Sequence, residues 1–260
     1  MKFLNPTNHL TLLHAINHIM IIPAVIYGSI GWWIATAALW FVIATVGISV
    51  GWHRNLAHRS FNCPVWFENM TALIGCLSFA GSPIGWVGVH RMHHANSDNT
   101  LDPHSPKNNF WRSYFHRWGH VQVPRKYVKS LFSKPFVKFL HRNYFGILYA
   151  WLGMLLLINP LAAVFFFSMV SVLAVHGFAS VNALSHTFGY RNYNVDDDSR
   201  NNWYANIMTA FSGEGWHNNH HALQGSHRFG NIEGVMPKEI DAGAWIIETL
   251  GYAKERYKLK

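Results

Sequence analysis

Two long stretches of this chain carry no charged side chain and alternate with polar parts. They cover residues 10–50 and 144–181, and all 21 Lys and Arg and all 12 Asp and Glu fall outside them. Each stretch is long enough for two helices of roughly 20 residues, the length that crosses a ~30 Å hydrocarbon core. Turn-forming residues interrupt the stretches at 28–31 and at Asn159-Pro160. The pattern predicts an all-α integral membrane protein with four transmembrane helices in two hairpins.

The chain is interpreted as a single domain, because no internal repeat or low-complexity linker divides it. Both predicted hairpins begin and end beside basic segments, and such segments favour the cytoplasmic side. We therefore expect both termini and a helical cytoplasmic cap on that side of the membrane. The domain, 1–260, comprises a first hairpin at 10–50, a polar segment at 51–143, a second hairpin at 144–182 and a polar segment at 183–260.

The composition agrees with a membrane protein. Half of the residues are apolar and 13% are charged, which is about half the charge of an ordinary soluble domain. The net charge of +9 comes without a nucleic-acid-binding module, so anionic lipid headgroups are the expected partners and nucleic acid is not. The first span lacks the basic start and cleavage site of a signal peptide. Cys63 and Cys76 give no disulfide framework.

Three further segments have their own patterns. Residues 66–89 are apolar but contain Glu68 and several Gly and Pro, so we expect them at the membrane interface or covered by protein. Residues 107–142 hold nine Lys or Arg, nine aromatic residues and no acid, which predicts one or two amphipathic helices on the cytoplasmic membrane face. This basic face is also suited to a phosphate-bearing substrate or an acidic electron donor. The tail from Pro237 is typical of a short amphipathic helix.

Eight of the 18 histidines stand in three tight clusters. Neutral imidazole is the commonest nitrogen ligand for transition metals, and eight such groups exceed what one ion can hold. Two metal ions are therefore predicted. The clusters are His53 and His58 in H-R-N-L-A-H, His90, His93 and His94 in H-R-M-H-H, and His217, His220 and His221 in H-N-N-H-H.

The spacing of these histidines predicts their geometry. In H-x-x-H-H they stand at i, i+3 and i+4, which places all three on one helix face within reach of a common site. His53 and His58 are about 140° apart on a regular helix, so either they serve different metals or the helix unwinds there. They follow the second predicted span, and Asn182 and His186 end the fourth. All of these side chains are expected at the same face of the membrane.

The ligand set restricts the metal. Zinc favours four-coordinate sites, whereas iron and copper suit imidazole and support oxygen chemistry. Soluble di-iron bundles use a pair of Glu-x-x-His motifs, which this chain does not show. A membrane metal transporter is a distant alternative, but it would place histidines along a path across the bilayer, and only His14, His18 and His176 fall within the predicted spans.

Several of these motifs, with the residues around them, resemble the membrane fatty acyl desaturases, most closely the acyl-CoA and delta-nine acyl-lipid branch. The likeness covers residues 51–222 in order. The segments are H-R-N-L-A-H-R-S-F from His53, G-S-P-I-G-W-V-G-V-H-R-M-H-H from Gly81 with D-P-H shortly after, N-A-L-S-H from Asn182, and G-E-G-W-H-N-N-H-H from Gly213.

The resemblance implies a di-iron enzyme that uses dioxygen and two electrons to insert a cis double bond, delta-nine by the closest branch, into a saturated fatty acyl chain. Unactivated methylenes offer no acidic proton or electrophilic centre, so such chemistry needs a redox-active cofactor. The resemblance also implies that Asn182 holds a water on one iron. It implies nine direct iron ligands: His53, His58, His90, His93, His94, His186, His217, His220 and His221.

Carboxylates commonly orient histidines that bind metals. The motifs place Asp98, Asp102 and Glu214 to do so, although each is also suited to a solvated loop.

Three residues are candidates for the acyl tunnel. Trp86 matches a family tryptophan that lines the bent part of the tunnel, with an interfacial anchor as the alternative. Phe41 and Thr45 precede His53 by two to three turns, so we hypothesise that they form the tunnel floor and limit chain length; core packing is the alternative.

Partners and rival functions follow from what the chain contains. No haem-binding H-P-G-G motif is present, so electrons are expected from a separate ferredoxin or small cytochrome, which a basic face attracts if the donor is acidic. The acyl head group stays open among coenzyme A, a carrier protein and a membrane lipid. A membrane di-iron lipid or alkane hydroxylase is the alternative enzyme.

Overall fold

The computed structural model describes residues 6–115, 121–232 and 238–253. Within these residues the regular elements are helices, and β-pairing is limited to three isolated bridges. The prediction of an all-α fold is confirmed. The predicted cytoplasmic termini lie outside the described residues.

The first apolar stretch folds as a helical hairpin. Its first arm is α1 (Pro6–Ile19) with α2 (Ile21–Tyr27), and its second arm is α3 (Ile30–Phe41) continued by the π-helix η1 (Val42–Ala57). The turn falls at Gly28, as predicted. A Cβ there would lie 2.3 Å from the Ala24 carbonyl oxygen and 2.5 Å from Phe165, so only glycine allows this close approach.

The second apolar stretch forms another hairpin. Its first arm is α9 (Tyr144–Ile158), and its second arm runs through α10 (Pro160–Ala163), η3 (Val164–Met169) and α11 (Val170–Asn182). The side chain of Asn159 accepts a hydrogen bond from the Leu161 amide at 2.8 Å. This cap, together with a proline at the first helical position, starts the second arm at the predicted turn.

Among the described residues, three apolar helices are long enough to cross a membrane: Asn8–Tyr27, Ile30–Ala57 and Pro160–His186. The fourth apolar helix, α9, has 15 residues, which at 1.5 Å per residue is about 22 Å. The apolar pattern therefore located four helices, of which three have the full length.

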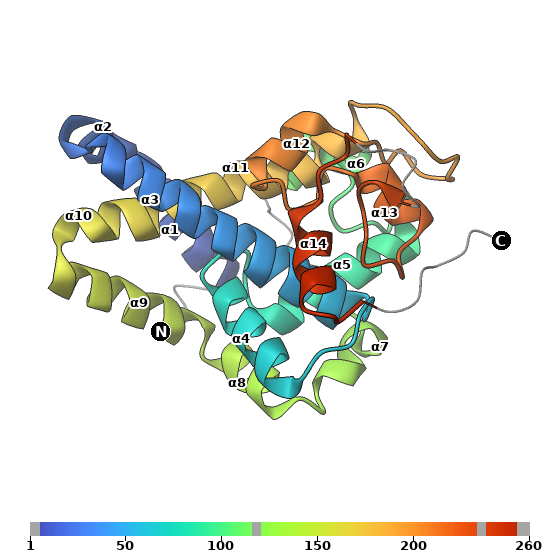
Figure 1. Cartoon of the computed structure of the whole chain (residues 1–260), viewed down its shortest axis with the longest axis horizontal. Coiled ribbons are helices and arrows are strands. Elements are labelled where there is room, and N and C mark those ends of the chain that lie inside the picture. Colours follow the sequence, from blue (N-terminus) through green and yellow to red (C-terminus); the bar gives the residue numbers. More distant parts are fainter. Residues whose placement is uncertain (1–5, 116–120, 233–237, 254–260) are drawn as a thin grey trace.

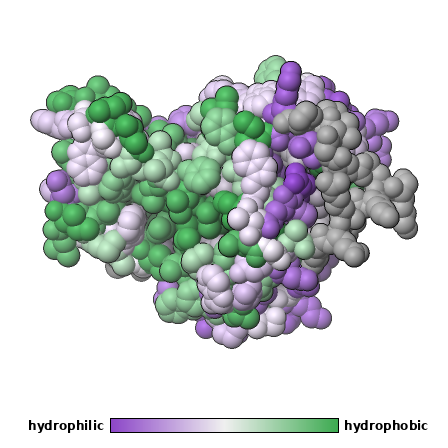
Figure 2. Space-filling view, in the orientation of Figure 1, coloured by the Kyte–Doolittle hydropathy of each residue, from purple (hydrophilic) through white to green (hydrophobic). Residues whose placement is uncertain are grey.

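The two hairpins project from one end of the molecule. In Figure 1, α2 and α10 lie at the left, and the short helices α5 (Pro83–Asn96), α13 (His217–Ala222) and α14 (Ala242–Thr249) lie at the right. Figure 2 shows hydrophobic residues over the hairpins and hydrophilic residues mainly at the opposite end. Side chains that are at least 60% exposed on the hairpins include Ile22, Val25, Ile26, Tyr27, Ile30, Ile34, Leu157 and Ile158. Exposed apolar surface of this extent indicates contact with lipid.

The apolar segment 66–89 is covered by protein in part. Its first helix, α4 (Val65–Cys76), packs on η1, where Trp52 Nε1 donates a hydrogen bond to the Ala72 carbonyl at 3.0 Å. Gly47 and Gly75 allow the two backbones to approach, because a Cβ on Gly47 would lie 2.7 Å from the Gly75 nitrogen.

The basic segment 107–142 contains more helices than the one or two predicted, and residues 116–120 lie outside the described ones. The tail contains α14, which agrees with the predicted short helix, although Pro237 itself is not described. The helices of the basic segment are α6 (Pro106–Tyr114), α7 (Arg125–Val128), η2 (Lys129–Leu131) and α8 (Pro135–Arg142). The two further helices among the described residues are η4 (Leu184–His186) and α12 (Trp203–Met208).

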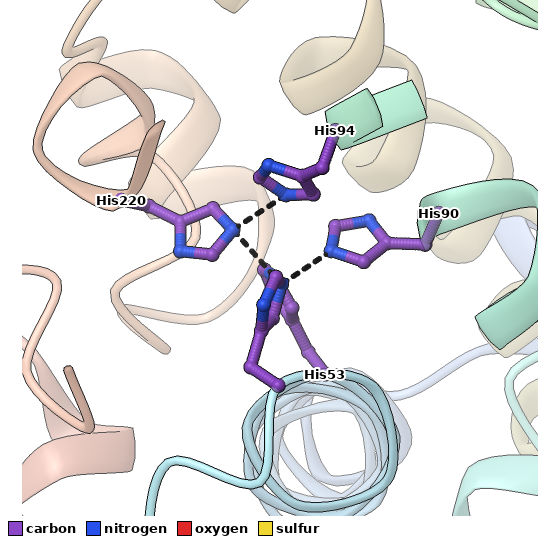
Figure 3. Close-up of side chains that lie close together, drawn as sticks. His53, His90, His94 and His220 are labelled. Atoms are coloured by element: carbon purple, nitrogen blue, oxygen red, sulfur yellow. Dashed lines mark hydrogen bonds between the residues drawn. The ribbon is translucent and has the colours of Figure 1, made fainter. Parts of the chain in front are cut away.

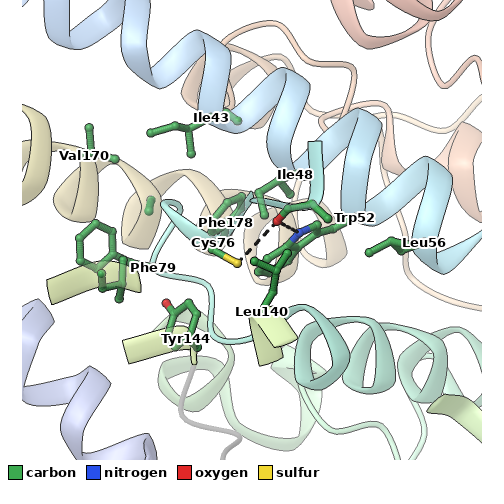
Figure 4. Packing of buried hydrophobic residues seen from close by; sticks show 14 of the residues in the cluster. Ile43, Ile48, Trp52, Leu56, Cys76, Phe79, Leu140, Tyr144, Val170 and Phe178 are labelled. Atoms are coloured by element: carbon green, nitrogen blue, oxygen red, sulfur yellow. Dashed lines mark hydrogen bonds between the residues drawn. The ribbon is translucent and has the colours of Figure 1, made fainter. Parts of the chain in front are cut away.

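The main core lies between η1, α4, α8 and the second hairpin (Figure 4). Trp52 and Phe79 are at most 1% exposed. Cys76 is a buried free thiol that contacts the Ala72 carbonyl, and Cys63 is a partly buried free thiol. Both cysteines are unpaired by disulfides, as the sequence predicted.

Candidate metal centre

The structure brings the nine predicted histidines into two adjacent groups. The potential ligand atoms within each group lie within 4.8 Å of one another. We call the first group the five-histidine cluster and the second the four-histidine cluster. The five-histidine cluster contains His53, His58, His90, His94 and His220, and the four-histidine cluster contains His93, His186, His217 and His221.

Each H-x-x-H-H motif contributes to both clusters, so the expectation that its three histidines share one site is wrong. In α5, His90 and His94 join the five-histidine cluster while His93 joins the other. In α13, His220 joins the five-histidine cluster, away from its two neighbours in the motif. The reason is helical geometry: residues i and i+4 are about 40° apart, whereas i+3 points about 60° to the other side of i.

The π-helix explains how His53 and His58 reach the same cluster. The His58 amide donates to the His53 carbonyl at 3.1 Å, a bond between residues five apart. In a π-helix, bonds of this kind join residues on adjacent turns that are five apart in sequence. The centroids of the two imidazole rings lie 5.0 Å apart. The structure therefore places both histidines in one cluster, and it does so with a continuous π-helix at this point and not with an unwound one.

Figure 3 shows the converging imidazole rings of the five-histidine cluster, with His53, His90, His94 and His220 labelled. His53 Nε2 lies 2.9 Å from His220 Nε2, which lies 2.9 Å from His94 Nε2. His58 Nε2 lies 2.7 Å from His90 Nε2. All of these contacts join the nitrogen atoms that point to the centre of the five-histidine cluster.

The three predicted carboxylates each contact a histidine. Glu214 accepts a hydrogen bond from His53 Nδ1 at 2.6 Å. The other two contacts are His93 Nδ1 to Asp102 at 2.8 Å and His186 Nδ1 to Asp98 at 2.7 Å.

Sequence reasoning missed a fourth carboxylate, Asp197, which accepts from His221 Nδ1 at 2.6 Å. The run of three aspartates at 196–198 was visible in the sequence. No spacing rule connected this run to the third histidine motif, because the chain returns to α13 only after α12.

Asp98 is held in place by several contacts. It has a φ of 59°, in the left-handed region that costs energy for residues other than glycine. Its carboxylate accepts from the Ser105 hydroxyl at 2.7 Å and the Asp198 amide at 2.9 Å. Burial raises the pKa of Asp98, but the hydrogen bond and charge of His186 outweigh burial, and the net pKa is lowered. The carboxylate is therefore ionised at neutral pH.

The tautomers set by these contacts show that a cation fits. A proton on Nδ1, donated to a carboxylate, leaves a lone pair on Nε2. His93 and His221 both have Nδ1 on a carboxylate, yet their Nε2 atoms face each other at 3.3 Å. Two facing lone pairs repel, and a metal ion bound by both removes the repulsion. All nine candidate ligands are imidazoles, the donors that iron and copper accept.

Burial keeps the imidazoles available as ligands. The pKa values of His90, His94 and His220 are well below the ordinary value, first because burial disfavours the charged form and second because neighbouring histidines do. The same causes lower the pKa values of His93 and His217. These rings are neutral at pH 7, the form that binds metals.

Aromatic rings pack on the five-histidine cluster. Trp86 stacks on His90 with 4.9 Å between ring centroids and an interplanar angle of 11°. Phe229, which sequence reasoning missed, lies 4.3 Å from the His220 ring and 4.9 Å from the His53 ring. Trp86 thus lies beside the metal centre, while its predicted place in an acyl tunnel stays a prediction.

The remaining predicted residues have different surroundings. Thr45 is buried, and its hydroxyl donates to the Ala210 carbonyl at 3.4 Å. Phe41 is 38% exposed on the hairpin surface. Asn182 ends α11 and is half-buried, four residues before His186. The tunnel-floor role of Phe41 and Thr45 and the water-holding role of Asn182 stay predictions.

An open pocket of about 410 Å³ reaches the five-histidine cluster. It gives two of the cluster's rings, those of His58 and His94, a connection to the surface. Its lining consists of Ala57, His58, Arg91, His94, Ala95, Gln224 and Gly225.

Comparisons with known proteins agree with the geometry. Residues 30–229 match the model of the fatty acid desaturase family. The chain is 40% identical to the sn-1 stearoyl-lipid 9-desaturase of Anabaena variabilis over 74% of this chain and 72% of that protein. It is 36% identical to the sn-2 palmitoyl-lipid 9-desaturase of Nostoc sp. (strain 36) over 84% of this chain and 78% of that protein. It is 34% identical to an acyl-CoA C20 Delta5-desaturase of Anemone leveillei over 83% of this chain and 69% of that protein.

Proposed function

The chain belongs to the fatty acid desaturase family, and from that premise we propose that it is a di-iron, oxygen-dependent delta-nine desaturase of membrane lipids. Family membership makes it a membrane oxidoreductase that desaturates fatty acyl chains. The observation that carries the di-iron proposal is the convergence of nine imidazoles into two clusters with facing Nε2 atoms.

The substrate proposal comes from the relatives. Those of Anabaena and Nostoc are named as desaturases of stearoyl and palmitoyl lipids at position 9. The relative from Anemone is named for acyl-CoA. We therefore propose an acyl-lipid substrate and keep acyl-CoA as the alternative.

Each group of residues has a role in this proposal. The five-histidine cluster binds one iron and the four-histidine cluster binds the other. Asp98, Asp102, Asp197 and Glu214 fix the tautomers that direct Nε2 inward, and Asn182 holds a water on one iron. Bound iron, with dioxygen and two electrons, supplies the oxidising power that unactivated methylenes require. The protein must then hold one pair of carbons beside the clusters, so that position decides which bond is oxidised.

We propose a four-span topology as one domain, with both termini and the metal centre on the cytoplasmic side. The exposed apolar hairpins, the mainly hydrophilic opposite end and the basic residues beside both hairpins in the sequence support this orientation. In this proposal α9 is the third span, and the bilayer or the neighbouring helices compensate for its 15 residues.

A separate electron donor, a ferredoxin or a small cytochrome, completes the proposal. Arg125, Lys126 and Lys129 are exposed on α7 and η2, and clustered cations attract an acidic partner. The pocket beside His58 and His94 is a place where the donor or dioxygen can approach the metal centre.

The test is expression in a bacterial host that lacks its own desaturase, with mass-spectrometric mapping of double bonds in the extracted lipids. We expect cis delta-nine monoenes in intact membrane lipids, and none from a matched His221→Ala variant. Hydroxylated acyl chains would instead support a membrane di-iron hydroxylase. Unchanged lipids from a correctly inserted, iron-loaded protein would contradict desaturation.

A further inference from the structure

Arg54 is a fully buried cation directly after His53 in η1, with 0% of its side chain exposed. A buried charge is stable only when it is paired and hydrogen-bonded. Nη2 donates to both oxygens of Asp241, at 2.8 and 3.0 Å, and Nε donates to the His227 carbonyl at 2.8 Å. Asp241 is therefore the main counter-ion of Arg54.

Arg54 also faces Glu214, the carboxylate that holds His53. Nη1 lies 3.6 Å from Glu214 Oε1 and donates to the Ser49 hydroxyl, which donates to the same Glu214 oxygen at 2.5 Å. The other oxygen of Glu214 accepts from His53 Nδ1. Glu214 is thus attracted in two directions, toward the imidazole and toward the guanidinium.

Asp241 connects this arrangement to the C-terminal segment. Its carboxylate caps α14 by accepting from the Ala244 amide at 2.9 Å, and it accepts from the Phe229 amide at 2.7 Å. Two glycines, Gly213 and Gly243, leave room for the ion pair of Arg54 and Asp241. A Cβ on Gly213 would lie 2.4 Å from Asp241 Oδ1, and a Cβ on Gly243 would lie 2.7 Å from Arg54 Nη1.

Phe229 lies between the ion pair and the metal centre. The guanidinium carbon of Arg54 lies 3.7 Å from the centre of the Phe229 ring. The same ring contacts His53 and His220. Arg54 therefore acts on Glu214 through its charge and on Phe229 through contact with the ring. Asp241 holds Phe229 by accepting a hydrogen bond from its backbone amide.

We propose that Arg54 and Asp241 are a positioning pair for the five-histidine cluster. Asp241 neutralises Arg54, so that Glu214 stays hydrogen-bonded to His53 and Phe229 stays against the imidazoles. The proposal rests on the proposed function in one respect, that each cluster binds a metal ion. No contact of this pair reaches the four-histidine cluster among the described residues, so its effect is confined to one of the two sites.

The test is metal binding by the purified full-length chain in detergent, stripped with a chelator and titrated anaerobically with Fe²⁺, and in parallel with Co²⁺ as a spectroscopic probe. We expect the unaltered protein to bind two ions. In Asp241→Asn the charge of Arg54 is no longer balanced and draws Glu214 away from His53. One site should then bind about 10-fold more weakly, with altered Co²⁺ absorption, while the other site is unchanged.

Glu248→Gln is the matched control. It removes a carboxylate from the same helix, one that pairs with Arg228 and His227 and is 29% exposed. We expect both sites to keep their affinity and spectrum in this variant.

The outcomes separate this inference from the proposed function. An Asp241→Asn protein that keeps both affinities, or loses both equally, would overturn the positioning role. An unaltered protein that binds no metal would overturn the proposed function instead. If Asp241→Asn does not accumulate, Ser49→Ala removes the hydroxyl that joins Arg54 Nη1 to Glu214 and keeps the Arg54–Asp241 ion pair. It should weaken the same single site, and unchanged binding at both sites would overturn the proposal.

Discussion

The two histidine clusters lie side by side but are supported in different ways. In the four-histidine cluster, carboxylates hold Nδ1 of His93, His186 and His221. In the five-histidine cluster, among the described residues, a carboxylate holds only His53. Its other rings depend on packing against Trp86, Phe229 and one another.

This difference also affects charge. Three carboxylates surround the four-histidine cluster, whereas the single carboxylate of the other lies 3.6 Å from the Arg54 guanidinium. Negative charge near a metal ion stabilises its more highly charged form. Two similar sets of imidazoles therefore provide unequal sites, one organised by hydrogen bonds to carboxylates and the other by helix geometry and aromatic packing.

The largest expected effect comes from two adjacent residues of α13. His220→Ala should remove the metal from the five-histidine cluster and His221→Ala from the four-histidine cluster, because the two rings point to different groups. Each variant should lose roughly one of two bound ions and all desaturation, since ligand count decides metal retention. Iron content and Mössbauer spectra measure this, and each variant should lose a different signal. Loss of the same Mössbauer signal from both variants would contradict the assignment of His220 and His221 to different sites.

Removing carboxylates should have a smaller effect. Asp197→Asn should weaken metal binding about 10- to 100-fold in the four-histidine cluster alone, because His221 loses its charged partner. Glu214→Gln should do the same in the five-histidine cluster. Asp198→Asn, which alters a surface pair with Lys107, is the control. Competition with a coloured chelator measures the affinities, and equal weakening of both sites by Asp197→Asn would contradict separate support.

Gly75→Ala should act on the five-histidine cluster through helix packing. A Cβ at Gly75 would lie 2.3 Å from Trp52 Nε1. This clash should push α4 away from η1, the π-helix that carries His53. Overpacking of this kind costs about 1–3 kcal/mol. Thermal unfolding in detergent should show the loss, and metal should leave the five-histidine cluster first. Gly153→Ala adds a Cβ with nothing within 4 Å and should change neither property.

The smallest expected effect is that of Trp86→Leu. Loss of the stacked ring on His90 should cost about 1 kcal/mol and reduce metal affinity only at the five-histidine cluster. Trp66→Leu is the control, because Trp66 is 60% exposed on α4. Unchanged binding in Trp86→Leu would show that the ring contact does not support the cluster.

Features that depend on residues near one another in the sequence were predicted well. The turns at Gly28 and Asn159 were located, as were the nine histidines and three of the four carboxylates that contact them. The bounds of α9 were also predicted, from residue 144 to the turn at Asn159, but they give a helix of 15 residues, which is shorter than the roughly 20 expected for a span.

The sequence by itself determined the apolar hairpins and the set of imidazoles, because hydrophobic runs and motif spacing are local properties of the chain. Only the tertiary structure decided how the imidazoles divide between two sites, since that depends on how α5 and α13 face each other and on the π-helical bond from His58 to His53. The same is true of Asp197 and of the pair formed by Arg54 and Asp241. The partners in these contacts are 24 and 187 residues apart, and no local pattern relates them.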